Sequence, residues 1–175
     1  MKPTKISILE MGFGTGLNAL ITYLEAGNRE LTIDYTGVEA FPISQEELSQ
    51  LNYVSELGEP QLKSAFHKIH KSPWGEECVF GPSFKLKKLK KDFFEVMYVD
   101  RFHLIYFDAF GRRVQPELWT VELFQKMYFA LKGKGVLVTY SAKGSVRRNL
   151  QEIGFTVERL PGPPGKREML RAFKP

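Results

Sequence analysis

The apolar positions of the chain fall into two patterns that alternate from one end to the other. Short apolar or alternating runs predict buried strands, whereas apolar residues three and four positions apart predict amphipathic helices. Seven runs are of the first kind, at residues 6–11, 31–39, 84–87, 102–108, 136–140, 155–160 and 168–173. Helical spacing follows four of them, at residues 17–24, from Ser44 onward, at 120–131 and at 141–153. This alternation predicts an α/β domain with a doubly wound, seven-stranded sheet.

Residues 52–81 interrupt the alternation with an irregular segment. We interpret this segment as a helical insertion, with Trp74 packed against the core. It contains His67, His70 and Cys78, which raise the question of a metal site. Two histidines and one cysteine at this spacing match no recognised ligand set, and no fourth ligand lies nearby. We therefore predict no metal.

Three glycines at alternate positions, Gly12, Gly14 and Gly16, separate the first predicted strand from the first helix. Glycine permits a positive φ and lets a ligand approach the backbone, and the helix that follows presents its N-terminus to a polar group. The third glycine of a dinucleotide fingerprint would stand at position 17, which is Leu17, so a nicotinamide enzyme is disfavoured. The G-x-G-x-G spacing is typical of enzymes that use S-adenosylmethionine (SAM). A tight turn without a ligand is the alternative.

Acidic residues follow three of the predicted strands. Glu39 ends the second strand, where it either accepts hydrogen bonds from the ribose hydroxyls of a nucleoside or lies on the surface. Asp92 follows the third strand, where it either accepts a hydrogen bond from the adenine amino group or caps a helix. Asp108 ends an almost unbroken apolar run, which indicates a central strand covered on both faces. Because ligands of open α/β sheets bind beyond the carboxyl ends of such strands, we expect Asp108 at the reacting atoms, with Phe110 nearby.

Length, composition and charge narrow the class of protein. The 175 residues predict one domain, and Cys78, the single cysteine, excludes an internal disulfide and is consistent with the cytoplasm. No apolar run approaches the roughly 20 residues that span a bilayer, and residues 1–5 precede no signal-peptide core, so we predict no membrane partner. The net charge of +5 is compatible with a nucleic-acid partner without proving one. For the five lysines within residues 85–91, a solvated face is favoured over an RNA contact.

Six segments together resemble the methyltransferase domain of the bacterial tRNA wobble-uridine modification enzymes MnmC and their stand-alone relatives, MnmD. They are residues 12–18, Glu39 with Phe41 and Pro42, and residues 107–110, 116–119, 146–150 and 165–170. The resemblance implies one SAM-dependent methyltransferase domain over residues 1–175. It also implies a Rossmann-like sheet of strand order 3-2-1-4-5-7-6, with the last strand antiparallel.

The activity of that family is methylation of the amine of 5-aminomethyl-2-thiouridine at the tRNA wobble position, with SAM as the methyl donor. The implied partner is the anticodon region of tRNA, on which upstream amine-forming enzymes also act. In MnmC a flavin-dependent oxidase domain follows, and we expect none here because the chain ends at Pro175. Relatives usually carry a further segment before the glycine strand, so a truncated N-terminus is one expectation.

The predicted site combines these observations with the resemblance. An amine substrate is protonated at neutral pH and must lose a proton before it attacks, so Asp108, with Phe110, is predicted to be catalytic. The predicted cofactor-binding residues are Glu10, Gly12, Phe13, Gly14, Thr15, Gly16, Asn18, Glu39, Asp92 and Asp108. The predicted RNA-binding residues are Tyr140, Arg147, Arg148, Lys166 and Arg167. Lys91 stands where relatives usually have glycine, which weakens the expected adenine contact of Asp92.

Two other functions fit the same residues. One is a SAM methyltransferase that acts on another amine, in a small molecule or a protein. The other is a non-catalytic RNA-binding module that has retained the fold. Measuring methyl transfer to RNA and to protein would separate the first from the tRNA enzyme, and titration with SAM would test the second.

Overall fold

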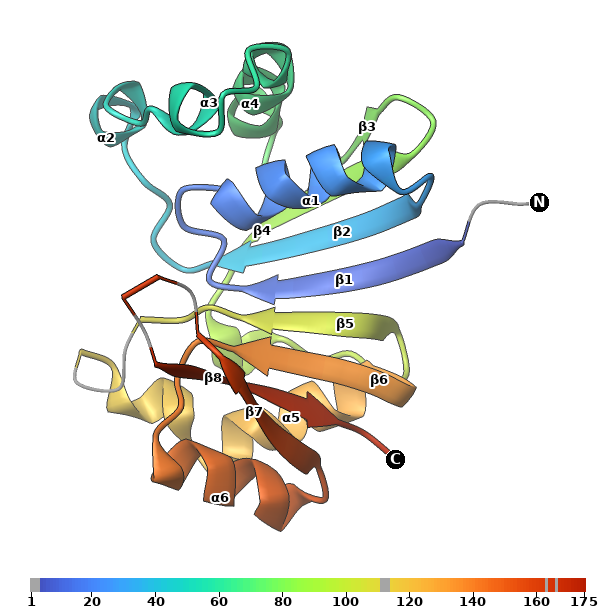
Figure 1. The fold of residues 1–175 in the computed structure, drawn as a ribbon, viewed down its shortest axis with the longest axis vertical. Coiled ribbons are helices and arrows are strands. Elements are labelled where there is room, and N and C mark those ends of the chain that lie inside the picture. The colour runs from blue at the N-terminus through green and yellow to red at the C-terminus, as the bar shows by residue number, and fades with distance from the viewer. Residues whose placement is uncertain (1–3, 111–113, 163, 166) are drawn as a thin grey trace.

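The computed structural model describes residues 4–110, 114–162, 164–165 and 167–175 (Figure 1). These residues form one sheet of eight strands: β1 (Lys5–Met11), β2 (Thr32–Glu39), β3 (Glu77–Phe80), β4 (Phe84–Lys90), β5 (Phe102–Phe107), β6 (Leu131–Thr139), β7 (Thr156–Pro161) and β8 (Glu168–Phe173). The strand order is β3-β4-β2-β1-β5-β6-β8-β7. Strands β4, β2, β1, β5 and β6 are parallel, and β8 runs antiparallel to both β6 and β7.

Helices cover both faces of the sheet. They are α1 (Leu17–Asn28), α2 (Gln45–Ser49), α3 (Tyr53–Glu56), α4 (Leu62–Lys71), α5 (Val121–Ala130) and α6 (Gly144–Ile153), with the 3₁₀ turns η1 (Phe93–Glu95) and η2 (Pro116–Trp119). Successive side chains of a strand point to opposite faces. Accordingly, Ile8 of β1 packs with residues of α1 and α4, whereas Leu9 packs with residues of α5 and α6. The two apolar clusters confirm the doubly wound architecture.

The predicted strand order is confirmed, and the predicted number of strands is one too low. Numbered by the seven predicted strands, the observed order is 3-2-1-4-5-7-6, with β3 added at the edge beside β4. Strand β3 lies within residues 52–81, which were interpreted as a helical insertion and also contain α3 and α4. It escaped prediction because it has four residues, of which Glu77 and Val79 are exposed. Such a short run carries too little periodicity to identify a strand.

Several predicted boundaries differ from the structure. Helix α1 includes Gly27 and ends at Asn28, beyond the predicted helical spacing of residues 17–24. Helix α5 ends at Ala130, because the buried Leu131 already pairs with β5 as the first residue of β6. The helix predicted from Ser44 onward begins as α2, where Ser44 and Glu47 form a capping box.

The carboxyl ends of β1, β2, β5 and β6 lie at one edge of the sheet, toward the left in Figure 1. The first three of these strands are followed there by the glycine turn after β1, the segment after β2 and the segment after β5. The backbone N–H of Asp108 donates to the carbonyl of Met11 at 2.9 Å, which joins the first and third of these loops. None of the helices in the described part of the chain has the length and apolarity needed to cross a bilayer.

Candidate active site

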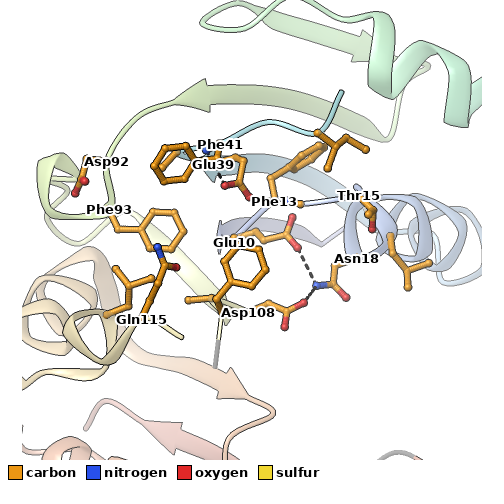
Figure 2. A pocket seen from close by; sticks show the side chains of 18 of the residues that line it. Glu10, Phe13, Thr15, Asn18, Glu39, Phe41, Asp92, Phe93, Asp108 and Gln115 are labelled. Atoms are coloured by element: carbon orange, nitrogen blue, oxygen red, sulfur yellow. Dashed lines mark hydrogen bonds between the residues drawn. The ribbon is translucent and has the colours of Figure 1, made fainter. Parts of the chain in front are cut away.

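A cavity of about 370 Å³ lies beyond the carboxyl ends of β1, β2 and β5 (Figure 2). Its walls come from the glycine turn, the segment after β2, the η1 turn, the segment after β5 and the η2 turn. The structure brings together here every predicted catalytic and cofactor-binding residue except Gly16: Glu10, Gly12, Phe13, Gly14, Thr15, Asn18, Glu39, Asp92, Asp108 and Phe110. Gly16 is not among the lining residues; it precedes the first residue of α1, with φ of 72°.

The glycine turn is held from two sides. The carboxylate of Glu39 accepts the backbone N–H of Gly14 at 2.9 Å and that of Phe41 at 3.0 Å. On the other side, the hydroxyls of Thr15 and Tyr53 share a hydrogen bond of 2.8 Å, so the insertion supports the turn. Glu39 is only 6% exposed, which rules out the alternative of a surface carboxylate. Each of its oxygens has a second lone pair, so a ligand hydroxyl can still be accepted.

Asp92 has the capping role that was one of its two predicted interpretations. Its Oδ1 accepts the backbone N–H of Phe94 at 2.8 Å, at the start of η1. The same exposed side chain lines the cavity, at the end where Figure 2 shows Phe41 and Phe93. The sequence interpretation did not assign these two phenylalanines to the site. Each of them is an aromatic residue shortly after the end of a strand, and this position was the sequence feature that could have identified them. Phe41 is 73% exposed.

A chain of hydrogen bonds crosses the floor of the cavity. The side-chain amide of Asn18 donates to Glu10 Oε1 at 2.8 Å and to Asp108 Oδ2 at 2.9 Å (Figure 2). The hydroxyl of Tyr35 donates to Glu10 Oε2 at 2.7 Å. Burial raises the pKa of Glu10 to about 8; hydrogen bonds from Tyr35 and Asn18 oppose this rise, and the negative charges of Asp108 and Glu39 add to it. Carboxyls with strongly shifted pKa values in a cavity are typical of functional sites.

The lining of the cavity is acidic. Its described lining residues include the carboxyls of Glu10, Glu39, Asp92, Asp108 and Glu117, and none of them is a lysine, arginine or histidine. Opposite charges attract strongly in a partly buried site, so this lining favours a cationic ligand. Among the described residues, no group of three or more His, Cys, Asp or Glu side chains is arranged to hold a metal ion.

Asp108 also borders a second hollow. A groove of about 260 Å³ runs from Asn18 and Asp108 past Tyr140 to Met169 of β8. The hydroxyl of Tyr140 donates to the backbone carbonyl of Ala109 at 2.7 Å. Burial raises the pKa of Tyr140, and the negative charge of Asp108 adds to this rise. Asp108 therefore borders both the cavity and the groove.

The predicted RNA-binding arginines lie near the same edge of the sheet. Arg147 and Arg148 are in the first turns of α6, which follows β6, and the buried Val146 and Leu150 hold this helix to the core. Arg148 is exposed, whereas Arg147 is half-buried, and its Nε has no hydrogen-bond partner among the described residues. Arg167 is exposed between β7 and β8. Lys166 lies outside the described residues.

The sheet order, the glycine turn, the acid that follows β2 and the adjoining cavity define a class of protein, a Rossmann-like domain that binds a nucleoside cofactor. Comparison with known proteins agrees and is more specific. Residues 84–175 match a family model described as S-adenosyl-L-methionine-dependent methyltransferase. The chain belongs to this family, and its cofactor is SAM, as the glycine spacing predicted.

The chain is also similar to proteins that carry names. The chain is 31% identical to the "tRNA 5-methylaminomethyl-2-thiouridine biosynthesis bifunctional protein MnmC" of Hydrogenovibrio crunogenus, over 95% of this chain and 26% of that protein. It is 31% identical to the protein of the same name from Nitrosospira multiformis, over 98% of this chain and 29% of that protein. The crystal structure of MnmC2 from Aquifex aeolicus superposes with a TM-score of 0.75 at 26% identity, over 97% of this chain and 53% of that one. The chain thus spans less than a third of the two full-length relatives.

The residues of the cavity fit SAM. A Cβ at Gly14 would meet no atom closer than 3.9 Å, so the absence of a side chain there leaves open space beside the turn. The cavity of about 370 Å³ falls within the range of 300–1,000 Å³ usual for small-molecule sites. The acidic lining suits a cofactor that carries a sulfonium and an ammonium group.

Proposed function

We propose that this domain transfers the methyl group of SAM to the amine of 5-aminomethyl-2-thiouridine at the wobble position of tRNA. The observation that carries the proposal is the position of Asp108, whose carboxylate lines both the cofactor cavity and the adjoining groove. The substrate is supported by the two MnmC relatives, whose name specifies biosynthesis of the methylated nucleoside in tRNA. Because the chain spans only a part of those proteins, the proposal concerns the methylation step alone.

The mechanism that we propose begins with the charge of the substrate. An aliphatic amine is protonated at neutral pH, as the lysine reference pKa of about 10.4 indicates, and an ammonium nitrogen has no lone pair with which to attack. SAM, when bound, supplies an electrophilic methyl group. Asp108 accepts a hydrogen bond from the ammonium, holds the nitrogen in place and is the first acceptor of its proton. Phe110 on the cavity side and Tyr140 on the groove side wall the uracil ring.

The cofactor contacts follow from the position of each residue along the cavity. Glu39, in the middle of the cavity in Figure 2, accepts the ribose hydroxyls in addition to its two backbone donors. The adenine lies toward Asp92, between the aromatic side chains of Phe41 and Phe93. This end of the cavity supplies flat apolar surface together with one acceptor for an amino group.

The RNA contacts that we propose are electrostatic. Arg147, Arg148, Lys166 and Arg167 neutralise phosphates of the tRNA, which positions the anticodon loop without reading its sequence. The net charge of +5 is concentrated outside the acidic cofactor cavity, which is consistent with separate sites for a cation and a polyanion. The amine itself has to be supplied by upstream modification enzymes that act on the same tRNA, and the compartment that we propose is the cytoplasm.

The proposal is tested by reconstitution. Purified protein is incubated with methyl-labelled SAM and with tRNA that carries 5-aminomethyl-2-thiouridine, and the nucleosides are then identified by mass spectrometry. We expect label in 5-methylaminomethyl-2-thiouridine and none in a matched tRNA with an unmodified wobble uridine. Label in an added protein or small amine, with none in the tRNA, would replace the proposed substrate. SAM binding without transfer to any acceptor would favour the non-catalytic module.

A further inference from the structure

Asn18 occupies an unusual position between two acidic groups. It is the second residue of α1, and its side-chain amide faces Glu10 at the end of β1 and Asp108 after β5 (Figure 2). Both amide hydrogens are used, at 2.8 Å to Glu10 and 2.9 Å to Asp108. An ionised carboxylate accepts hydrogen bonds and donates none, so it selects the NH₂ end of the amide over the oxygen.

The amide is fixed because its other partner is immobile. Glu10 is 1% exposed, and its second oxygen accepts the hydroxyl of Tyr35, which is fully buried in β2. Glu10 presents an acceptor oxygen to Asn18 in either protonation state. Asn18 therefore connects an exposed carboxylate, Asp108, to groups buried in the centre of the sheet.

We propose that Asn18 is a positioning residue for methyl transfer, which holds the Asp108 carboxylate at the junction of the cavity and the groove while Glu10 and Tyr35 hold Asn18. The inference rests on the proposed function, since it assigns Asn18 to the acid–base step of that reaction. A fixed donor on one oxygen restricts the rotamers that the Asp108 side chain can adopt before the substrate arrives. A misplacement of about 1 Å can reduce turnover about 10²-fold, so such a support affects the rate directly.

The hydrogen bond also affects the protonation of Asp108. A donor to a carboxylate favours its charged form, so loss of the donor makes the group bind its proton at higher pH. Among the residues that the structure describes, the titratable groups that face Asp108 from the packed elements include Glu10 of β1, Tyr35 of β2 and Tyr140 after β6. Since Asp108 acts in its ionised form, removal of the Asn18 amide should move the acid limb of the kcat profile to higher pH.

The test uses Asn18→Leu, which keeps the size of the side chain and removes its hydrogen bonds. We expect kcat for tRNA methylation to fall about 10²-fold and affinity for SAM to fall no more than about tenfold. Asn28→Leu, the same change at the exposed far end of α1, is the control. Asn18→Gln retains an amide on a longer arm and should recover part of kcat. It also serves as the second variant, should Asn18→Leu fail to fold.

Two measurements separate positioning from a merely structural role. If Asn18 acts through Asp108, Asn18→Leu causes little further loss in an Asp108→Asn background, and the acid limb of the pH profile moves upward in the single variant. An equal proportional loss in both backgrounds, or an unmoved acid limb, overturns the inference.

A carboxyl ¹³C NMR titration of Asp108, without substrate, keeps this result distinct from the proposed function. If the wild type fails to methylate the tRNA but Asp108 titrates at higher pH in Asn18→Leu, the proposed substrate fails and the coupling between the two residues stands. If the wild type is active and Asp108 titrates at the same pH in Asn18→Leu as in the wild type, the two residues are not coupled and the inference is wrong.

Discussion

A Cβ atom at Gly12 would lie 2.4 Å from the backbone carbonyl oxygen of Asp108. The glycine turn that borders the cofactor cavity is thus in direct contact with the segment that carries the proposed catalytic carboxylate. Gly12 also has φ of 98°, a conformation that L-residues with a side chain rarely adopt. Gly12 must therefore both leave room for the Asp108 carbonyl and adopt a positive φ. The close approach arises because β1 and β5 are adjacent parallel strands whose carboxyl ends meet at the cavity.

Gly14 provides a cleaner test of the cofactor site than Gly12. A Cβ atom at position 14 would meet no protein atom closer than 3.9 Å, but φ of 49° opposes a β-branched residue. We expect Gly14→Val to abolish SAM binding, measured by isothermal titration, while the far-ultraviolet circular dichroism stays largely intact. Gly27→Ala is the control, because Gly27 lies inside α1 and no atom lies within 4 Å of the position of its added Cβ. This variant should bind SAM like the wild type. Undiminished affinity in Gly14→Val would place the cofactor elsewhere.

The positions of Glu39 and Asp108 in the cavity could be predicted from the sequence, because an acid directly after a buried strand must emerge at the carboxyl edge of the sheet. The strand order itself was implied by family resemblance, and apolar runs such as residues 102–107 located its central strands. The positions of the two acids and of the central strands were predictable because they depend on local pattern and on rules that hold for all doubly wound sheets.

Lys88 shows what local pattern cannot reveal. It belongs to a lysine-rich run interpreted as a solvated face, yet it is 2% exposed. Its Nζ donates to the carbonyl of His70 at 3.1 Å and lies 4.9 Å from the centre of the Trp74 ring. Lys88 is buried because the insertion covers this part of β4. The spacing of residues within the run carries no information about that contact. The double hydrogen bond of Asn18 was missed for the same reason, since its partners come from distant parts of the chain.

The buried carboxyl of Glu10 predicts an unusual dependence of stability on pH. Its pKa is about 8 in the folded protein and near the ordinary 4.5 in the unfolded chain. Between these values the folded state holds a proton that the unfolded state has lost, so the protein loses stability as pH rises from 4.5 through 8. Glu10→Gln removes this effect. In urea unfolding without cofactor, the variant should gain stability relative to wild type with rising pH, by an amount on the order of a few kcal/mol.

Glu47 supplies the control of opposite sign. Its pKa is lowered by hydrogen bonds from the backbone and side chain of Ser44, so it stabilises the fold above its unfolded pKa and loses this effect as pH falls. Glu47→Gln should therefore lose stability relative to wild type at neutral pH and not at low pH. A stability difference between Glu10→Gln and wild type that stays constant from pH 5 to pH 8.5 would contradict the assignment for Glu10.

The proposed RNA surface predicts a change in salt dependence. Arg147→Ala with Arg148→Ala should weaken tRNA binding for all sequences and reduce the slope of log affinity against log salt by about one unit for each lost phosphate contact. Lys5→Ala with Arg29→Ala removes the same charge at the opposite edge of the sheet and should leave the slope unchanged. The half-buried Arg147 also needs a single variant. If only Arg148→Ala changes the slope, Arg147 has a structural role, and if neither does, the surface is not the one proposed.

Asp108→Asn tests the proposed chemistry most directly, because it keeps the shape of the side chain and removes its charge. SAM affinity should change little, since the glycine turn and Glu39 remain, whereas kcat should fall by roughly 10²–10⁴, as is typical for a lost acid–base group. An amine that is already neutral needs no proton acceptor, so the activity of the variant should recover in part as pH rises toward the pKa of the substrate amine. The measurement is single-turnover methylation of tRNA from pH 6.5 to pH 9.5. Wild-type turnover at pH 7 would remove Asp108 from proton transfer and leave alignment of the substrate with the cofactor as the source of the rate.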